Sequence, residues 1–183
     1  TGKVLQSLCE FDSSAQRVGG DERIIVVSGS EQCGVVNKTN ITAAKTATGL
    51  DGIANSASTL TATSADAIIL QPTSGIASAA RCSSAYVRRK TGTGTISFTQ
   101  DGGSTWTDIT PNINSATYSR VQITATLANP SVGFKISTSG DAIAVDCVQN
   151  EAGSVATSPI VTTSTTVNRN ADSLTYQTAS NWS

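Results

Sequence analysis

Apolar and polar residues alternate along most of the chain, in short runs separated by Gly, Pro and Asn. A period of two is typical of strands that bury one face. No stretch after residue 22 keeps the 3.6-residue period of a helix. Many short strands with turn residues between them predict an all-β fold, a jelly-roll-like antiparallel β-sandwich. The predicted strands are residues 24–27, 58–63, 67–70, 79–90, 95–99, 106–109, 118–127, 132–137 and 142–148.

The strongest local signal is a hairpin at residues 95–109. Polar residues alternate with Ile96 and Phe98, which predicts a half-buried strand. An Asp-Gly-Gly turn follows, with the positive φ angles that tight hairpins need, and a Trp opens the return strand. The spacing resembles the Asp-box hairpin of sialidases and other β-proteins. That resemblance implies that the Asp side chain accepts hydrogen bonds from the turn and that the Trp packs beneath it. The predicted structural turn is Asp101, Gly102, Gly103 and Trp106.

Composition narrows the functional classes. A chain of 183 residues suits one domain with added arms, and its net charge of −1 favours neither nucleic acid nor an anionic membrane as a partner. Only 14% of residues are charged and 4% aromatic, with many Ser and Thr, as in extracellular or particle-surface proteins.

There is no apolar run of 18 residues, so no transmembrane helix is expected. The sequence contains no His, the commonest general base and metal ligand, and we expect no cofactor and no metal.

The four cysteines do not form a metal or redox motif. None has the C-x-x-C spacing, and free buried thiols are favoured over disulfides. Mid-strand Cys82 and Cys147 are expected to be buried as small apolar residues, and an inter-strand disulfide between them stays open. The cysteines are Cys9, Cys33, Cys82 and Cys147.

Candidate catalytic carboxylates are few. A glycosidase needs two carboxylates facing each other across the scissile bond. Asp101 and Asp108 flank a turn, and Asp141 and Asp146 lie on or beside one strand. Neither pair comes with an acid–base environment, so we expect no catalytic residues and no enzymatic activity.

A basic run and a few aromatic residues could contact a glycan or a partner. The run 88–90, Arg-Arg-Lys, is the only dense basic patch. It is interpreted either as a solvated strand end that protects a sheet edge or as a contact with an acidic glycan or partner. Aromatic rings stack on sugars, although Trp106 and Tyr86 are expected to be packed. The candidate contacts are Tyr86, Arg88, Arg89, Tyr118 and Trp182.

The two ends of the chain differ from its centre. We expect an N-terminal arm at residues 1–22, the sandwich at 23–153 and an extended C-terminal tail at 154–183. Such long segments have little core of their own, and apolar residues within them would be exposed on a lone monomer. Neighbouring copies with closed symmetry would cover them.

Several segments in order resemble jelly-roll modules of tailed-phage structural proteins. The C-terminal signature is the most specific: Gln-x-Glu-x-Gly at 149–153, Ala-Thr-Ser-Pro-Ile at 156–160 and Val-x-Arg-x-Ala-Asp at 167–172. Related modules often carry an aromatic residue before this signature, where this chain has 145–147, Val-Asp-Cys. The other similar segments are 84–94, the Asp-Gly-Gly hairpin, 118–120 and 139–142.

The resemblance implies a carbohydrate-binding-module-like sandwich on the surface of a phage particle. The expected function is that of a non-enzymatic virion structural protein, as a capsid decoration or a tail or fibre component. The expected partners are other copies, as a homotrimer, and other virion proteins. The alternative is a host-glycan-binding attachment module of a tail fibre or spike.

Overall fold

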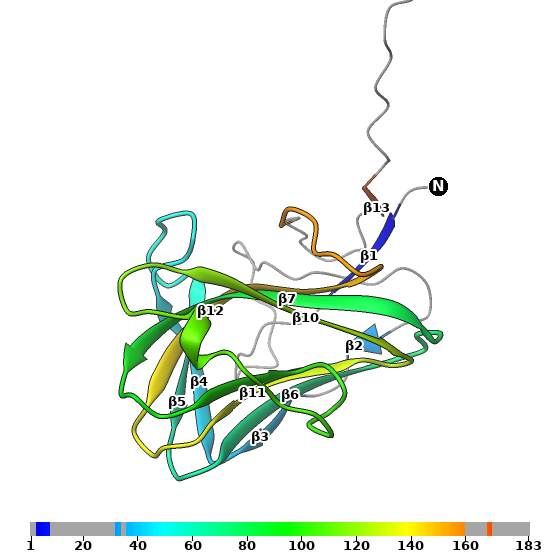
Figure 1. The fold of residues 1–183 in the computed structure, drawn as a ribbon. Helices are drawn as coiled ribbons and strands as arrows, with labels where there is room; N and C mark the ends of the chain where they lie inside the picture. Colours follow the sequence, from blue (N-terminus) through cyan, green and yellow to red (C-terminus); the bar gives the residue numbers. More distant parts are fainter. Residues whose placement is uncertain (1–2, 8–31, 34–35, 160–167, 170–183) are drawn as a thin grey trace, which may run out of the picture.

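The structure, a computed structural model, describes residues 3–7, 32–33, 36–159 and 168–169 and consists of two antiparallel sheets packed face to face (Figure 1). This confirms the predicted all-β antiparallel sandwich. The predicted strand at 24–27, Trp182 and Cys9 lie outside the described residues.

The first sheet has seven strands and carries the longest elements. β12 (Ala142–Ala152) lies at its centre and pairs with β7 (Ala79–Thr91) along one side. On its other side the first half of β12 pairs with β5 (Ala57–Ala62) and the second half with β1 (Lys3–Ser7). The remaining strands are β4 (Ile41–Ala47), β10 (Ser119–Leu127) and β13 (Asn168–Arg169).

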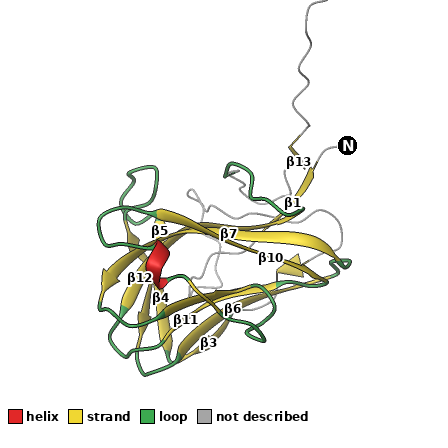
Figure 2. Cartoon of the chain, in the orientation of Figure 1, coloured by secondary structure: helices red, strands yellow, loops and turns green. Residues whose placement is uncertain are grey.

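The second sheet has six strands and closes the other side of the core. Its strands are β2 (Gln32–Cys33), β3 (Asn37–Thr39), β6 (Ala67–Ser74), β11 (Ser131–Ile136), β8 (Ile96–Thr99) and β9 (Thr107–Asp108). One 3-10 turn, Thr110–Asn112, follows β9 (red in Figure 2), where Pro111 fixes a φ suited to the start of a helical turn. Within the described ranges, no helix has the length and apolar character to cross a membrane.

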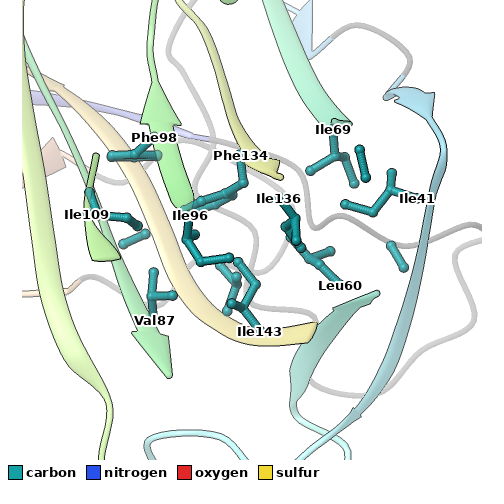
Figure 3. Close-up of a cluster of buried hydrophobic side chains, with 14 of the residues drawn as sticks. Ile41, Leu60, Ile69, Val87, Ile96, Phe98, Ile109, Phe134, Ile136 and Ile143 are labelled. Carbon is teal, nitrogen blue, oxygen red and sulfur yellow. The ribbon is translucent and has the colours of Figure 1, made fainter. Parts of the chain in front are cut away.

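The core lies between the two sheets and is made by the apolar positions of the period-two pattern (Figure 3). Phe98 of β8 and Phe134 of β11 are direct cross-strand partners. Their rings stack with centroids 4.8 Å apart, and both are fully buried. Opposite them, Leu60, Val87 and Ile143 project from the first sheet into the same cluster. Removal of these side chains from water is the main stabilising term for such a fold.

A bulge in β12 changes which of its residues share a face. Asp146 pairs with Tyr86, but the next registered pair is Gln149 with Ser84, so β12 has one extra residue. Cys147 lies in the bulge at φ 47°. The expectation that Cys147 is buried mid-strand is therefore wrong: it is partly exposed, whereas Cys82 is buried as expected. The two do not form the inter-strand disulfide that was left open.

Two further expectations need correction. The basic run 88–90 does not lie at an open sheet edge: β12 pairs with it on one side, and on the other, beyond the last residue paired with β10, the Arg89 N–H donates to the Asn114 carbonyl at 2.8 Å. β8 is not half-buried, since all four of its residues are buried, including Ser97 and Thr99. β8 is paired on both sides by β11 and β9, and the hydroxyl of Thr99 is bonded within the turn that follows.

Candidate functional site

The Asp-Gly-Gly turn has the structure that its sequence predicts. The carboxylate of Asp101 accepts hydrogen bonds from the Thr99 hydroxyl at 2.7 Å and from the Thr105 backbone N–H at 3.0 Å. Gly102 and Gly103 have φ angles of 74° and 89°, a region that disfavours side chains. A Cβ on Gly103 would also collide with the ring of Trp106, which packs against the turn. The turn is thus held together by its own side chains.

Burial opposes ionisation of Asp101, but the hydrogen bonds from Thr105, Thr99 and Gly103 together outweigh it and hold the pKa of Asp101 below its usual value. Replacing Asp101 by alanine is expected to lower the free energy of unfolding by about 1–2 kcal/mol. Because the folded-state pKa is depressed, this stabilisation is present above the unfolded pKa of about 3.9 and is lost as the pH falls through the folded value.

Urea unfolding of wild type and D101A at neutral and acidic pH measures both effects. Ser104→Ala, which removes only an exposed hydroxyl bonded to the Asp101 carbonyl, is the control and should change stability by less than about 0.5 kcal/mol. A D101A protein of unchanged melting temperature that has lost ligand binding would overturn the structural assignment.

The outer face of the seven-stranded sheet brings together two arginines and two tyrosines. Tyr86 and Arg88 are two residues apart on β7, and the same spacing separates Tyr118, just before β10, from Arg120 within it. Arg120 and Tyr86 are cross-strand partners. The guanidinium carbon of Arg120 is 5.5 Å from the centre of the Tyr86 ring, and that of Arg88 is 5.2 Å from the Tyr118 ring. We call these four partly exposed residues the Arg–Tyr face.

A loop at residues 48–56 lies at one side of this face and is fixed to it. The Leu50 N–H donates to the Asp146 carboxylate at 2.8 Å, and the Tyr118 hydroxyl donates to the Thr48 carbonyl at 2.8 Å. Beneath Tyr118 are small side chains of β4, β5 and β12 that let its ring lie against the sheet. Burial raises the pKa of the Tyr118 hydroxyl; the positive charge of Arg88 opposes this and the negative charge of Asp146 adds to it.

At the other side of the face, a buried network holds the segment 153–159. Glu151 is fully buried. One of its carboxylate oxygens accepts from the Thr157 N–H and from the Gln149 amide, each at 2.7 Å, and the other accepts from the Thr157 hydroxyl at 2.9 Å. Arg120 donates to the Thr157 carbonyl and to the Ser84 hydroxyl. The bulge in β12 makes this possible, since it turns Gln149 and Glu151 to the same face as Asp146.

The structure brings together three of the five candidate contacts. Tyr86, Arg88 and Tyr118 form the Arg–Tyr face, while Trp182 lies outside the described residues. Arg89 projects to the opposite side of β7, where it forms a 3.5 Å ion pair with Asp141 and donates to the Gly94 carbonyl. The sequence-based assignment missed Arg120. Its position two residues after Tyr118 on an alternating strand was the available signal.

The carboxylates that could have formed a catalytic pair are engaged in structural hydrogen bonds. Asp108 accepts from the Thr110 N–H at 2.8 Å, and hydrogen bonds from Thr110 lower the pKa of Asp108. Asp141 accepts from the Gly94 N–H at 2.7 Å, and Asp146 from Leu50 and Cys147. A general acid needs a raised pKa, and Asp101 and Asp108 have the opposite shift.

No protein-family model and no curated protein sequence matches this chain. Solved structures with a similar fold include carbohydrate-binding modules. A CBM29-2 mutant complexed with mannohexaose is 8% identical with a TM-score of 0.45, over 83% of this chain and 93% of that one. CBM6cm-2 from Cellvibrio mixtus lichenase 5A, in complex with cellotriose, is 16% identical with a TM-score of 0.43, over 82% and 98%.

A phage protein is also among the similar structures. The enzymatically active domain of bacteriophage CBA120 tailspike protein 4 is 13% identical with a TM-score of 0.43, over 64% of this chain and 19% of that one. These values do not assign the chain to any of the three families. The assignment of the sandwich rests on the strand pairing itself.

Proposed function

We propose that this protein is a non-enzymatic structural module of a tailed-phage particle, exposed on the particle surface as a capsid decoration or a tail or fibre component. The observation that carries the proposal is the network around Glu151. Gln149, Glu151 and Thr157 belong to the two segments whose sequence resembles virion proteins, and they bond directly to one another. The signature thus has a structural task, which is to hold the chain after β12 against the sheet.

The hydrogen bonding of the acidic residues supports a non-enzymatic role. Asp101, Asp108, Asp141 and Asp146 each accept a hydrogen bond from a backbone N–H that fixes a turn or a loop. A carboxylate used in this way is unsuited to protonating a leaving group. The predicted homotrimer and the contacts with other virion proteins belong to this proposal.

Immunogold labelling tests the location. Antibodies against the recombinant chain are applied to purified particles produced by the virus or prophage whose genome encodes it. Labelling at a fixed position on intact particles is expected, at the head surface or on the tail. Absence of the chain from purified particles, together with its presence in the particle-free lysate, would refute a virion role.

The second candidate function is attachment to a host glycan. It is favoured by the Arg–Tyr face, where aromatic and hydrogen-bonding side chains lie together on the outer side of a sheet. Both tyrosine rings are already covered by guanidinium groups, so the face does not offer a bare aromatic platform for a neutral sugar.

A further inference from the structure

The charges on the Arg–Tyr face are not balanced by ion pairs. Within the described part of the chain, the salt bridge is that of Arg89 with Asp141, on the other side of β7, and neither Arg88 nor Arg120 takes part in one. The carboxylates beside the face accept from other donors. Asp146 accepts from Leu50 and Cys147, and Glu151 from Gln149 and Thr157. Asp51, whose negative charge acts on Tyr118, accepts from Ile53 and Ser56. Two guanidinium groups therefore lie on the face without a bonded anion.

The two guanidinium groups are held in different ways. Arg120 uses one terminal nitrogen to bond Ser84 and the Thr157 carbonyl, so it also fixes the segment 153–159. Arg88 is held by its contact with the Tyr118 ring, and its Nε is buried without a hydrogen-bond partner. A guanidinium that stacks by one face can still offer the edge formed by its two terminal nitrogens for a bidentate contact with a carboxylate. Arg88 is thus the better placed of the two to bind an anion.

Apolar side chains flank the same face. The large apolar side chains that are exposed in the described part of the chain are Leu50, Ile53 and Val155, with exposed fractions of 41%, 52% and 56%. All three lie on the loop 48–56 or the segment 153–159, the two segments anchored at the sides of the Arg–Tyr face. Both segments rise from the outer side of the seven-stranded sheet, the loop in cyan and the segment in orange (Figure 1).

A ligand for this surface needs discrete negative charges, many hydroxyl groups and apolar C–H patches. A saccharide that carries carboxylates has all three. Nucleic acid fits less well, because binding to a phosphate backbone relies on a broad basic patch and the chain has a net charge of −1. We propose that the Arg–Tyr face binds a carboxylate-bearing glycan, of the uronic or sialic acid class, with Arg88 as the main contact to the carboxylate.

Biolayer interferometry with immobilised glycans tests this. The probes are oligogalacturonate and oligosialic acid, each compared with its own carboxyl-reduced form, and dextran sulfate as a general polyanion. Wild type is expected to bind at least one acidic probe and to lose at least about tenfold in affinity for its reduced form. No binding to either acidic probe, equal binding to a reduced form, or equally strong capture by dextran sulfate would overturn the proposal.

Substitutions locate the site. Arg88→Gln is expected to weaken binding at least about tenfold, and Arg88→Lys, which keeps the charge but loses the planar fork, to give an intermediate loss. Lys38→Gln removes the same charge from β3 in the other sheet and should leave affinity unchanged. If Arg88→Gln does not fold, the affinities of Arg88→Lys and Lys38→Gln for the acidic probe are compared instead. A weaker affinity of Arg88→Lys alone then supports Arg88 as the contact. Equal affinities of the Arg88 variants and wild type would refute the assignment to Arg88, whatever the particle labelling shows.

Discussion

Replacing Phe134 by alanine is expected to lower the free energy of unfolding by about 3–5 kcal/mol, a large part of the total for a domain of this size. Phe134 is fully buried, stacks on Phe98 and has Ile69 as its partner on the other neighbouring strand. Alanine leaves a cavity between three strands whose backbones are held by hydrogen bonds, so the surrounding side chains cannot collapse into it.

Equilibrium urea unfolding, followed by circular dichroism, measures the effect. Phe134→Leu is the matched variant: it keeps an apolar side chain of similar volume and should cost only about 1–2 kcal/mol. A loss below about 1 kcal/mol for Phe134→Ala would mean that the two sheets are not packed through this pair.

Glu151→Ala is expected to have the second-largest effect, a loss of about 3 kcal/mol. The substitution removes the acceptor of three hydrogen bonds, from the Thr157 N–H, the Thr157 hydroxyl and the Gln149 amide. The Thr157 N–H and hydroxyl lose the acceptor they have in the network, and the Gln149 amide keeps only its 3.3 Å bond to the Thr157 carbonyl. Since each unsatisfied buried group costs about 1–3 kcal/mol, the segment 153–159 should reduce the loss by leaving the sheet and becoming hydrated.

Hydrogen exchange separates local release from global unfolding. In Glu151→Ala the Thr157 amide should exchange at least about tenfold faster than in wild type, while the amides of β8 and β11 are less affected. Glu151→Gln retains one carbonyl oxygen and should show a smaller change. Continued protection of the Thr157 amide in Glu151→Ala would show that the network does not hold the segment.

The hydrophobic pattern was sufficient to predict the sandwich, because burial of one face of each strand imposes the period of two. It also predicted the turn at Asp101, whose side-chain hydrogen bonds join residues at most four positions apart. Such short-range features are encoded by a few neighbouring residues and can be read directly.

The composition of the Arg–Tyr face was only partly predictable. Tyr86, Arg88 and Tyr118 were named, but their partner Arg120 was not, since the pairing of β7 with β10 is a long-range property that periodicity does not contain. The edge position of residues 88–90 was wrong because the loop before β10 covers them through the hydrogen bond from Arg89 to Asn114, which is also a contact distant in sequence. The role of Glu151 also depends on the extra residue at Cys147, and an alternating pattern gives no sign of where a strand gains one.

The extra residue at Cys147 determines on which face of the sheet each later residue of β12 lies. Removing one residue from the bulge would exchange the inside and the outside for the rest of β12: Gln149 and Glu151 would turn to the core, and Asn150, which bonds Ser83 in the interior, would turn to the surface. A single deletion would therefore act as a simultaneous substitution at every later position of the strand. Insertions and deletions at residues 147–148 should be tolerated in this protein only in pairs, whereas conservative substitutions there need no compensation.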